Sequence, residues 1–298
     1  LKKVLPQVRI WMGGPEASYD AVHLMDELPE VELIMQGEGE ETFTRLVEAC
    51  ECGTEVCFSE LPGIVLRRSD GTIEVHRPAP LMNLDDIPFS YGDLSGLEHR
   101  IIYYESSRGC PFSCSYCLSS IDKKVRFRSL SLVTRELQFF LDRKVPQVKF
   151  VDRTFNCKKS HSMAIWQYLL EHDNGITNFH FEISSDLLDD DELALMKQMR
   201  PGLIQLEIGV QTTNLMVVKE IRRTMDLDKV ARRVAQVNTF GNIHQHLDLI
   251  AGLPYEDIES FHRSFNDVYK MEPEQLQLGF LKVLKGSYMY EHASEYGL

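Results

Sequence analysis

The sequence has no apolar run long enough to cross a membrane. Its densest apolar stretch, residues 248–254, is only the length of a strand, whereas a transmembrane helix needs about 20 apolar residues. Residues 1–6 also lack the long apolar core of a signal peptide. We therefore expect no membrane span. Because the chain starts without Met, directly before a strand-like segment, we expect it to be a piece of a longer protein.

Positive charge is scarce as well. The 32 Lys and Arg residues face 45 Asp and Glu residues, which gives a net charge of −13. Such an acidic chain is a poor general binder of polyanions, so we expect no general nucleic-acid binding. The 43% hydrophobic and 26% charged residues are typical of a globular protein. At about 150 residues per domain, 298 residues make one large domain or two unequal ones.

Cysteines are few and irregularly spaced. The seven cysteines are residues 50, 52, 57, 110, 114, 117 and 157. An odd number without regular spacing argues against a secreted disulfide framework. Free or metal-bound thiols in a reducing cytoplasm are the better interpretation.

The first 99 residues divide into two parts. Residues 1–60 contain two short apolar segments, 8–12 and 31–35, each followed by glycines and then by a helical pattern. This order indicates parallel strands of an α/β fold, although two strands are too few for a complete domain. Residues 61–99 are rich in Pro and Gly. Within this linker, the apolar segments 64–66 and 72–75 around Asp70 and Gly71 predict a β-hairpin.

The remainder, residues 100–298, alternates strand-like and helical segments. The candidate strands are residues 101–106, 147–152, 178–184, 203–210, 244–250 and 276–283. Six such units without antiparallel hairpins predict a parallel sheet with helical crossovers. We expect this sheet to curl into a partial (β/α)6 TIM-like barrel. Functional groups then gather at the C-terminal ends of the strands.

One motif stands directly after the first of these strands. Cys110, Cys114 and Cys117 form a CxxxCxxC pattern, and three thiolates so close together can surround one metal centre. Iron–sulfur cubanes usually take four cysteines, so three ligands would leave one iron open to a small molecule. A zinc site with a distant fourth ligand, or coincidental cysteines, are the alternatives that spacing alone leaves open.

With this motif, residues 100–298 resemble the radical S-adenosylmethionine (SAM) superfamily. The resemblance implies that the three cysteines hold a 4Fe–4S cluster and that the fourth iron binds SAM. It implies that one electron, from a donor such as a flavodoxin or ferredoxin, cleaves SAM to methionine and a 5′-deoxyadenosyl radical. It also places Tyr116, just before the last cysteine, near the adenine. The resemblance leaves the substrate unidentified.

Further positions match cofactor-contacting segments of the superfamily. Asp152 lies in the region that contacts the amino group of SAM, although a structural Asp at a strand end fits equally well. Glu182 and Gln211, in or after the third and fourth strands, match contacts of coproporphyrinogen-dehydrogenase-like members. Arg223 matches their cofactor-binding arginine, with Arg222 as the neighbouring alternative.

The segment DLIAGLP, residues 248–254, resembles the DLIxGLP segment of the superfamily. The resemblance implies that Gly252 lets the backbone approach adenine and that Asp248 binds a polar cofactor group. We expect Glu182, Gln211, Arg223 and Asp248 to point into one cavity together with the cysteine loop.

Residues 1–60 carry a second resemblance. Gly13 and Gly14 follow the first predicted strand, and Gly37 and Gly39 follow the second. In this order they resemble the C-terminal part of the Rossmann-like cobalamin-binding domain that precedes the barrel in many radical enzymes. Glycines at strand ends let the backbone approach the corrin tail. The lower-ligand motif DxHxxG is absent from this sequence. If cobalamin binds, the implied outcome is methyl transfer to an unactivated carbon.

Several alternatives stay open. Without cobalamin, the resemblance also allows a radical oxidoreductase or a rearrangement enzyme. From the residues alone, a zinc-stabilised nucleic-acid-binding module or a non-catalytic α/β assembly protein fits too. His244 and His246 share a strand face, but without a third ligand nearby in the sequence we interpret them as satisfied strand histidines. We interpret the basic run 123–128 as a solvated face rather than a site for an acidic substrate.

Overall fold

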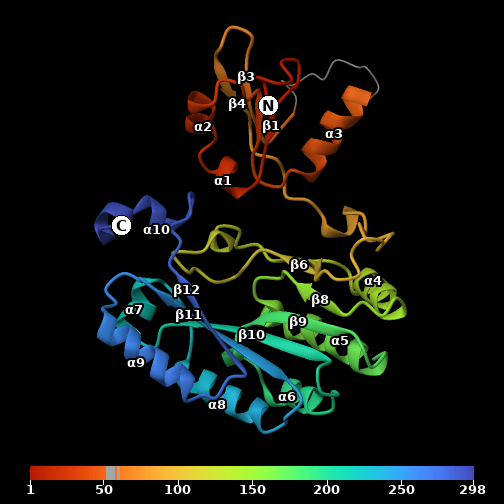
Figure 1. The fold of residues 1–298 in the computed structure, drawn as a ribbon, viewed down its shortest axis with the longest axis vertical. Helices are drawn as coiled ribbons and strands as arrows, with labels where there is room; N and C mark the ends of the chain where they lie inside the picture. The colour runs from red at the N-terminus through yellow and green to blue at the C-terminus, as the bar shows by residue number, and fades with distance from the viewer. Residues whose placement is uncertain (52–57, 59–60) are drawn as a thin grey trace. The chain divides into compact units, whose positions relative to one another are not determined.

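The computed structural model of the protein describes residues 1–51, 58 and 61–298. Contacts within the chain divide it into two compact units (Figure 1). The smaller unit comprises residues 1–82 and 283–298, and the larger comprises residues 83–282. None of the helices in the described part of the chain is both long and apolar enough to cross a membrane.

The larger unit is built on a six-stranded sheet. The strand order is β12-β11-β10-β9-β8-β5, and every neighbouring pair is parallel. The strands are β5 (Ile102–Tyr104), β8 (Gln147–Phe150), β9 (Asn178–Ile183), β10 (Ile204–Gln211), β11 (His244–Ala251) and β12 (Gln275–Phe280). These are the six strands predicted from the sequence, each within a few residues of its expected bounds, and the parallel sheet is confirmed.

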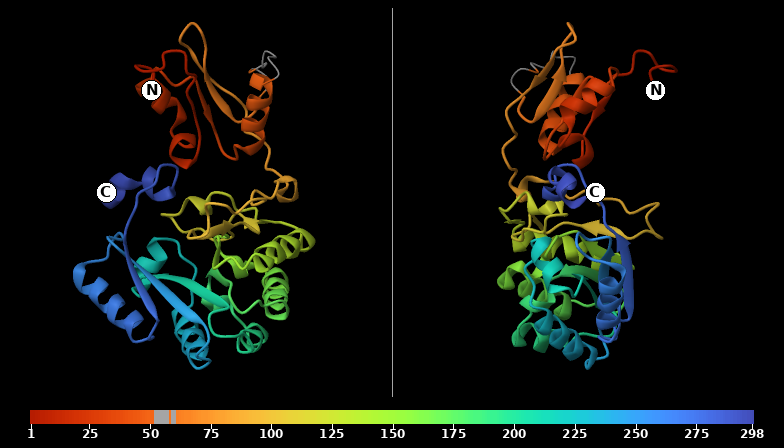
Figure 2. Two further views of the ribbon diagram at one scale, coloured as in Figure 1. Left: turned by 45° about the vertical axis from the view of Figure 1, so that its right-hand side comes forward. Right: turned by 90° about the vertical axis from the view of Figure 1, so that its left-hand side faces the viewer.

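Helical crossovers join the strands, as parallel pairing requires. Figures 1 and 2 show the longer helices along the outer face of the sheet. The α-helices are α4 (Leu130–Asp142), α5 (Lys159–Glu171), α6 (Asp190–Met196), α7 (Leu215–Glu220), α8 (Leu227–Asn238) and α9 (Ile258–Tyr269). Short 3-10 helices are η2 (Leu84–Asp86), η3 (Leu118–Ser120), η4 (Phe155–Cys157) and η5 (Ser185–Leu187).

Aromatic side chains fill the space between the sheet and its helices. Phe181 on β9 packs against Phe150 of β8 and Phe155 of η4, with ring centroids 4.5 and 4.3 Å apart. Trp166 of α5 meets Phe181 edge to face and is fully buried. Burying each such side chain contributes roughly 1.5–3 kcal/mol. This cluster therefore fixes α5 and η4 on the outer face and leaves the opposite face for polar residues.

The strands alternate between the two faces of the sheet. Along β10, buried residues alternate with half-buried ones, and the half-buried set includes Glu207 and Gln211. Paired residues of parallel strands point to the same face. Because Glu207 pairs with Glu182 of β9 and with His246 of β11, all three side chains lie on the inner face, away from the helices.

The smaller unit has a sheet of its own, with strand order β1-β2-β3-β4. The strands are β1 (Trp11–Met12), β2 (Leu33–Met35), β3 (Ile64–Arg67) and β4 (Ile73–Val75). The α-helices are α1 (Pro15–Ser18), α2 (Ala21–Glu27), α3 (Glu40–Glu51), α10 (Tyr288–Glu291) and α11 (Ala293–Tyr296). Strands β1 and β2 are parallel, as predicted, whereas β3 and β4 are antiparallel to their neighbours.

The predicted hairpin belongs to this sheet rather than to a linker. Its first strand pairs with β2, with Leu66 opposite Leu33 and Val65 opposite Ile34. These apolar side chains are buried on the two faces of the sheet, one against α1 and α2 and the other against α3. Contacts also group residues 83–99 with the larger unit, so this grouping differs from the predicted boundaries at 60 and 99.

Candidate functional site

The three motif cysteines lie on a loop that is closed on itself. A short antiparallel ladder holds the loop, with β6 (Ser107–Arg108) on one side and β7 (Arg126–Phe127) on the other. The sequence pattern did not indicate this two-stranded ladder, which is separate from the parallel sheet. The Cys110 amide also donates to the Asp122 carbonyl oxygen at 3.0 Å. The loop is therefore tied at its base, directly after the end of β5.

Gly109 is required where the loop leaves the ladder. Its φ is +98°, a conformation that L side chains rarely adopt. A Cβ at this position would lie 2.9 Å from the Lys124 carbonyl oxygen and 3.1 Å from that of Asp122. Both the backbone angle and the space exclude a side chain here. The sequence analysis missed this residue, although its place before the first motif cysteine was a signal.

The motif cysteines present free thiols of suitable chemistry for a cluster. Cys110 and Cys114 are both buried, at 8% exposure, and Cys117 is half-buried. Burial raises the pKa of the Cys114 thiol, while the nearby Arg223 guanidinium acts in the opposite direction. Three sulfur atoms in a sheltered loop are the ligand set that iron–sulfur centres use. The residues present therefore fit a cluster of this kind.

Arg223 faces this loop from the segment between α7 and α8. Its Nη1 lies 3.2 Å from the Tyr116 hydroxyl and 3.7 Å from Cys114 Sγ, and its Nη2 donates to the Gly209 carbonyl oxygen. Arg222, the alternative from the sequence, is exposed and has a φ of +55°. The structure therefore brings Arg223 and Tyr116 together at the motif.

Gln211 joins the same group through an irregularity of β10. The pairing of β10 with β11 shifts between Gly209 and Gln211, and Gln211 has a φ of +74°. Its side-chain amide lies against Gly209, because a Cβ added at Gly209 would be only 2.4 Å from Gln211 Nε2. Its Oε1 is buried without a hydrogen-bond partner. This amide oxygen is thus available to a ligand donor.

Glu182 and Asp248 lie on the inner face, as expected. Glu182 pairs with Glu207 in the sheet register, and Asp248 pairs with Gly209. Burial, followed by the neighbouring Glu207 carboxylate, raises the pKa of Glu182. Gly252 follows β11 with a φ of +89°, so the backbone turns sharply there. Neither carboxylate faces the helix layer, and their contacts to a cofactor stay predictions.

Asp152, the position matched to the contact with the amino group of SAM, is engaged by serines of the cysteine loop. It is fully buried, and it accepts hydrogen bonds from the Ser106 amide at 2.9 Å and from the Ser106 and Ser107 hydroxyls at 2.6 and 2.5 Å. Burial raises its pKa to about 6, although these hydrogen bonds act in the other direction. The carboxylate thus ties the end of β8 to the start of the cysteine loop. This geometry favours the structural alternative.

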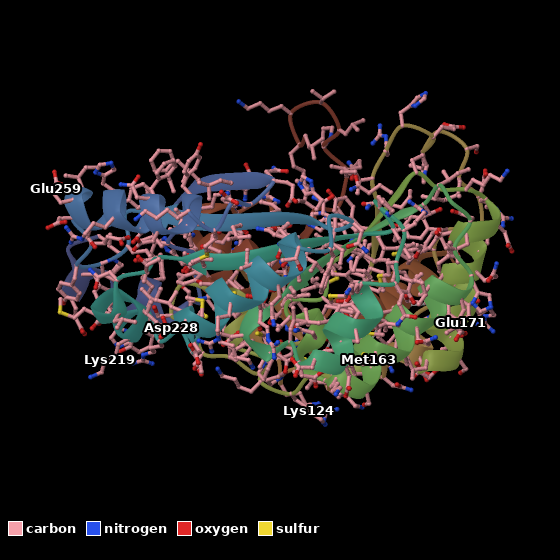
Figure 3. All side chains as sticks on the ribbon, turned by 90° about the horizontal axis from the view of Figure 1, so that it is seen from below. Lys124, Met163, Glu171, Lys219, Asp228 and Glu259 are labelled. Atoms are coloured by element: carbon pink, nitrogen blue, oxygen red, sulfur yellow. The ribbon has the colours of Figure 1, made fainter. Side chains whose placement is uncertain are left out.

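The basic run after the motif is partly the predicted solvated face and partly a set of local contacts. Lys123 Nζ donates to the Phe112 carbonyl oxygen at 2.6 Å, within the cysteine loop. Arg128 is buried in an ion pair with Glu136, at 2.5 Å. Lys123 and Lys124 are both exposed, as predicted for a solvated face, and Lys124 lies at the periphery in Figure 3. The run therefore stabilises the loop from its far side.

In the smaller unit, the predicted glycines lie in turns at the C-terminal ends of two adjacent parallel strands. Gly13 and Gly14 follow β1, and Gly37 and Gly39 follow β2. Gly14 and Gly37 have φ values of +90° and +71°, and a Cβ at either would meet nothing within 4 Å. Ser18 connects α1 to the turn after β2, since its hydroxyl accepts a hydrogen bond from the Gly37 amide at 3.1 Å. These backbones are open to a ligand.

The remaining cysteines and histidines give mixed outcomes. Cys50 and Cys157 are free thiols, and Cys52 and Cys57 lie outside the described residues. The two histidines predicted to be satisfied differ: His246 Nε2 lies 3.0 Å from Asp248 Oδ1, whereas His244 Nε2 is buried without a hydrogen-bond partner. His246 has neighbours on other strands that the local sequence did not reveal.

Comparison with known proteins agrees with this geometry. Residues 104–268, more than half of the chain, match the family model of the Radical SAM superfamily. The chain therefore belongs to the Radical SAM superfamily, and the resemblance inferred from the cysteine motif is confirmed.

Two curated relatives and one solved structure illustrate the relationship. The uncharacterized methyltransferase PH0819 of Pyrococcus horikoshii is 25% identical over 306 residues, which cover 98% of this chain and 64% of the relative. The cobalamin-dependent radical SAM methyltransferase TokK of Streptomyces tokunonensis is also 25% identical, over 100% of this chain and 46% of its own length. The chain thus spans only part of the length of these relatives.

The solved structure supports the fold. The radical SAM methyltransferase TsrM of Kitasatospora setae, with tryptophan and a SAM analogue bound, matches with a TM-score of 0.80 and 16% identity. The match covers 98% of this chain and 59% of that one. The α/β fold predicted from the sequence, with a parallel sheet of the TIM-like partial-barrel type, is confirmed.

Proposed function

We propose that the larger unit binds a 4Fe–4S cluster through Cys110, Cys114 and Cys117 and reductively cleaves SAM. The observation that carries this proposal is the closed loop of three free thiols, tied at its base by Gly109 and faced by Arg223. When bound, the cluster supplies the electron that splits SAM into methionine and a 5′-deoxyadenosyl radical.

The surrounding residues then have distinct tasks toward SAM. Arg223 holds the Tyr116 ring in place, and we assign this ring to the adenine. The free Oε1 of Gln211 accepts a donor of the cofactor. The turn at Gly252 lets the backbone approach the nucleoside. Glu182 and Asp248 line the same inner face with carboxylates.

We further propose that the whole protein transfers a methyl group to an unactivated carbon with the help of cobalamin. The names of PH0819 and TokK point to methyl transfer, and that of TokK also to cobalamin. In this chain, the support is the pair of open glycine turns at the ends of β1 and β2. Ligands of open α/β sheets bind outside such strand ends.

The reducing environment and the electron donor are part of the same proposal. All five cysteines in the described part of the chain are free thiols, as a reducing cytoplasm would keep them. The electron would come from a small redox protein such as a flavodoxin or ferredoxin.

Anaerobic reconstitution tests the central claim. The protein should take up about four iron atoms per chain through the three-cysteine motif. With SAM and dithionite, it should release 5′-deoxyadenosine and methionine. A variant with all three motif cysteines replaced by Ala should bind no cluster and form neither product. Stoichiometric zinc without iron uptake would refute the cluster.

A further inference from the structure

A second group of potential metal ligands lies on the inner face of the sheet, apart from the cysteine motif. His180 on β9, Glu207 on β10 and His246 on β11 each offer one ligand atom, and the three atoms lie within 4.8 Å of one another. They come from three adjacent strands. Register explains the grouping, because Glu207 pairs directly with His246, and His180 lies two residues before Glu182, the other partner of Glu207.

Each of the two imidazoles in this group faces a carboxylate but makes no aligned hydrogen bond through Nε2. His180 and His246 are 7% and 5% exposed, and the Nε2 atoms of both lack a hydrogen-bond partner. The His180 Nε2 lies 2.9 Å from the Glu207 carboxylate, and the His246 Nε2 lies 3.0 Å from Asp248 Oδ1, both without hydrogen-bond alignment. A buried polar atom without a partner costs about 1–3 kcal/mol. A bound cation would satisfy both nitrogen atoms at once.

The charges nearby also favour a cation. Besides Glu207, the inner face carries Glu182 and Asp248, so three carboxylates share this region. Lys149 is the cation closest to Glu207, with Nζ 2.7 Å from Oε2 and 3.7 Å from Glu182 Oε1. The positive charge of the exposed Arg153 acts to lower the pKa of Glu182. Three carboxylates on this face therefore stand against one half-buried lysine.

We propose that His180, Glu207 and His246 bind a divalent first-row transition-metal ion. Neutral imidazole nitrogens and a carboxylate suit zinc and ferrous iron, and two histidines with one carboxylate leave coordination positions open. The ion would lie on the inner face, where those open positions can take an oxygen or nitrogen atom of a substrate. This site uses no residue of the thiolate motif, so metal binding here can be tested independently of cluster binding.

Lys149 provides a sharp test, because it competes with the ion for the Glu207 carboxylate. Replacing Lys149 with Met keeps the carbon chain and removes the charge. The proposal predicts that K149M binds the metal more tightly than the parent. A hydrogen-bonded ion-pair cluster without a metal function predicts no uptake in either protein.

His244 provides a matched control. It lies on the same strand and face as His246, two residues earlier, and its Nε2 is likewise buried without a partner. It pairs with Gln205 rather than Glu207, so it is outside the ligand group. H246A should therefore lose metal binding, whereas H244A should keep it.

The measurement uses Co²⁺ on the full chain in which the three motif cysteines are replaced by Ala. We expect one equivalent of Co²⁺ with d–d absorption and without thiolate charge transfer, displaced by Zn²⁺. H180A, E207Q and H246A should each weaken binding by about tenfold or more, and circular dichroism should verify that each variant folds. Absence of uptake, a thiolate band without the nitrogen–oxygen signature, or equal loss in H244A and H246A would overturn the proposal.

Discussion

The Arg223 guanidinium lies 3.2 Å from the Tyr116 hydroxyl, although the two residues are 107 positions apart in the chain. The same guanidinium donates to the Gly209 carbonyl oxygen and faces Cys114 Sγ. One side chain therefore connects the cysteine loop with the strand β10. Because a planar guanidinium presents donors in a fixed fork, it can hold these groups in one geometry, which a lysine cannot do.

We predict that Arg223→Lys impairs SAM cleavage while iron uptake is retained. A hydrogen bond to a charged group is worth about 1.5–3 kcal/mol, so the rate of 5′-deoxyadenosine formation should fall tenfold or more. Arg222→Lys is the matched control, because Arg222 is the exposed neighbour and its replacement should leave the rate near that of the parent. Equal rates for both variants would show that the contacts of Arg223 do not matter for the reaction.

The second prediction concerns Gly109. Gly109→Ala should reduce iron uptake and lower the free energy of unfolding by more than the roughly 1–3 kcal/mol of a strained backbone alone, because the new Cβ would collide with two carbonyl oxygens. Gly175→Ala is the control. Gly175 has a φ of +73° in the same unit, but a Cβ there meets nothing within 4 Å. Urea unfolding and iron analysis compare the two, and similar losses in both would contradict the steric argument.

Much of this architecture follows from local patterns. The alternation of apolar and polar residues in β9 and β10 predicts which side chains share the inner face, because the side-chain period of a strand is two. The same alternation could have pointed to Lys149 and Glu207, which lie at half-buried positions between buried apolar ones. The spacing of Cys110, Cys114 and Cys117 was sufficient to indicate the superfamily.

Contacts between distant segments could not be read in this way. The role of Asp152 depends on Ser106 and Ser107, which reach it from 46 and 45 positions earlier. The hairpin pairs with β2 because its apolar residues complete a sheet, a partnership that no local pattern records. His246 meets Glu207 through the register between two strands. In each case the tertiary register, rather than the local sequence, selects the partner.

The third prediction is a pH dependence that arises from Asp152. Its pKa in the folded protein, about 6, lies above the usual 3.8 of an aspartate side chain. The protonated carboxyl therefore stabilises the fold below pH 3.8, and that contribution is lost as the pH rises through 6. The shift corresponds to at most about 3 kcal/mol. Asp152→Asn removes this titration, although its amide would face the Ser106 amide donor and destabilise the protein.

The comparison across pH separates these two effects. The stability deficit of Asp152→Asn relative to the parent should shrink as the pH rises from about 4 to 7, because only the parent loses the protonated carboxyl. Urea midpoints of both proteins at several pH values measure the deficit. A deficit that grows with pH would mean that the hydrogen bonds of Ser106 and Ser107 outweigh burial and hold the pKa of Asp152 low.

The last prediction concerns the glycine turns of the smaller unit and cobalamin. Gly37 lies at the end of β2 with a φ of +71°, and a Cβ there would extend into open space. Gly37→Ala should therefore cost only the roughly 1–3 kcal/mol of backbone strain, yet abolish corrin binding if the backbone there approaches the corrin tail. The measurement is the corrin absorbance that a longer form of the protein retains after desalting, compared with this chain.

Gly71→Ala is the control for that experiment. Gly71 has a φ of +88° and equally open surroundings, but it lies in the turn between β3 and β4 rather than at the end of a parallel strand. Both substitutions should lower stability to a similar extent, while only Gly37→Ala should lose corrin, because ligands of such sheets bind beyond the carboxyl ends of parallel strands. If the longer protein retains no corrin at all, or if Gly37→Ala retains as much as Gly71→Ala, the turn serves only the fold. The methyl-transfer proposal then loses its support from this chain.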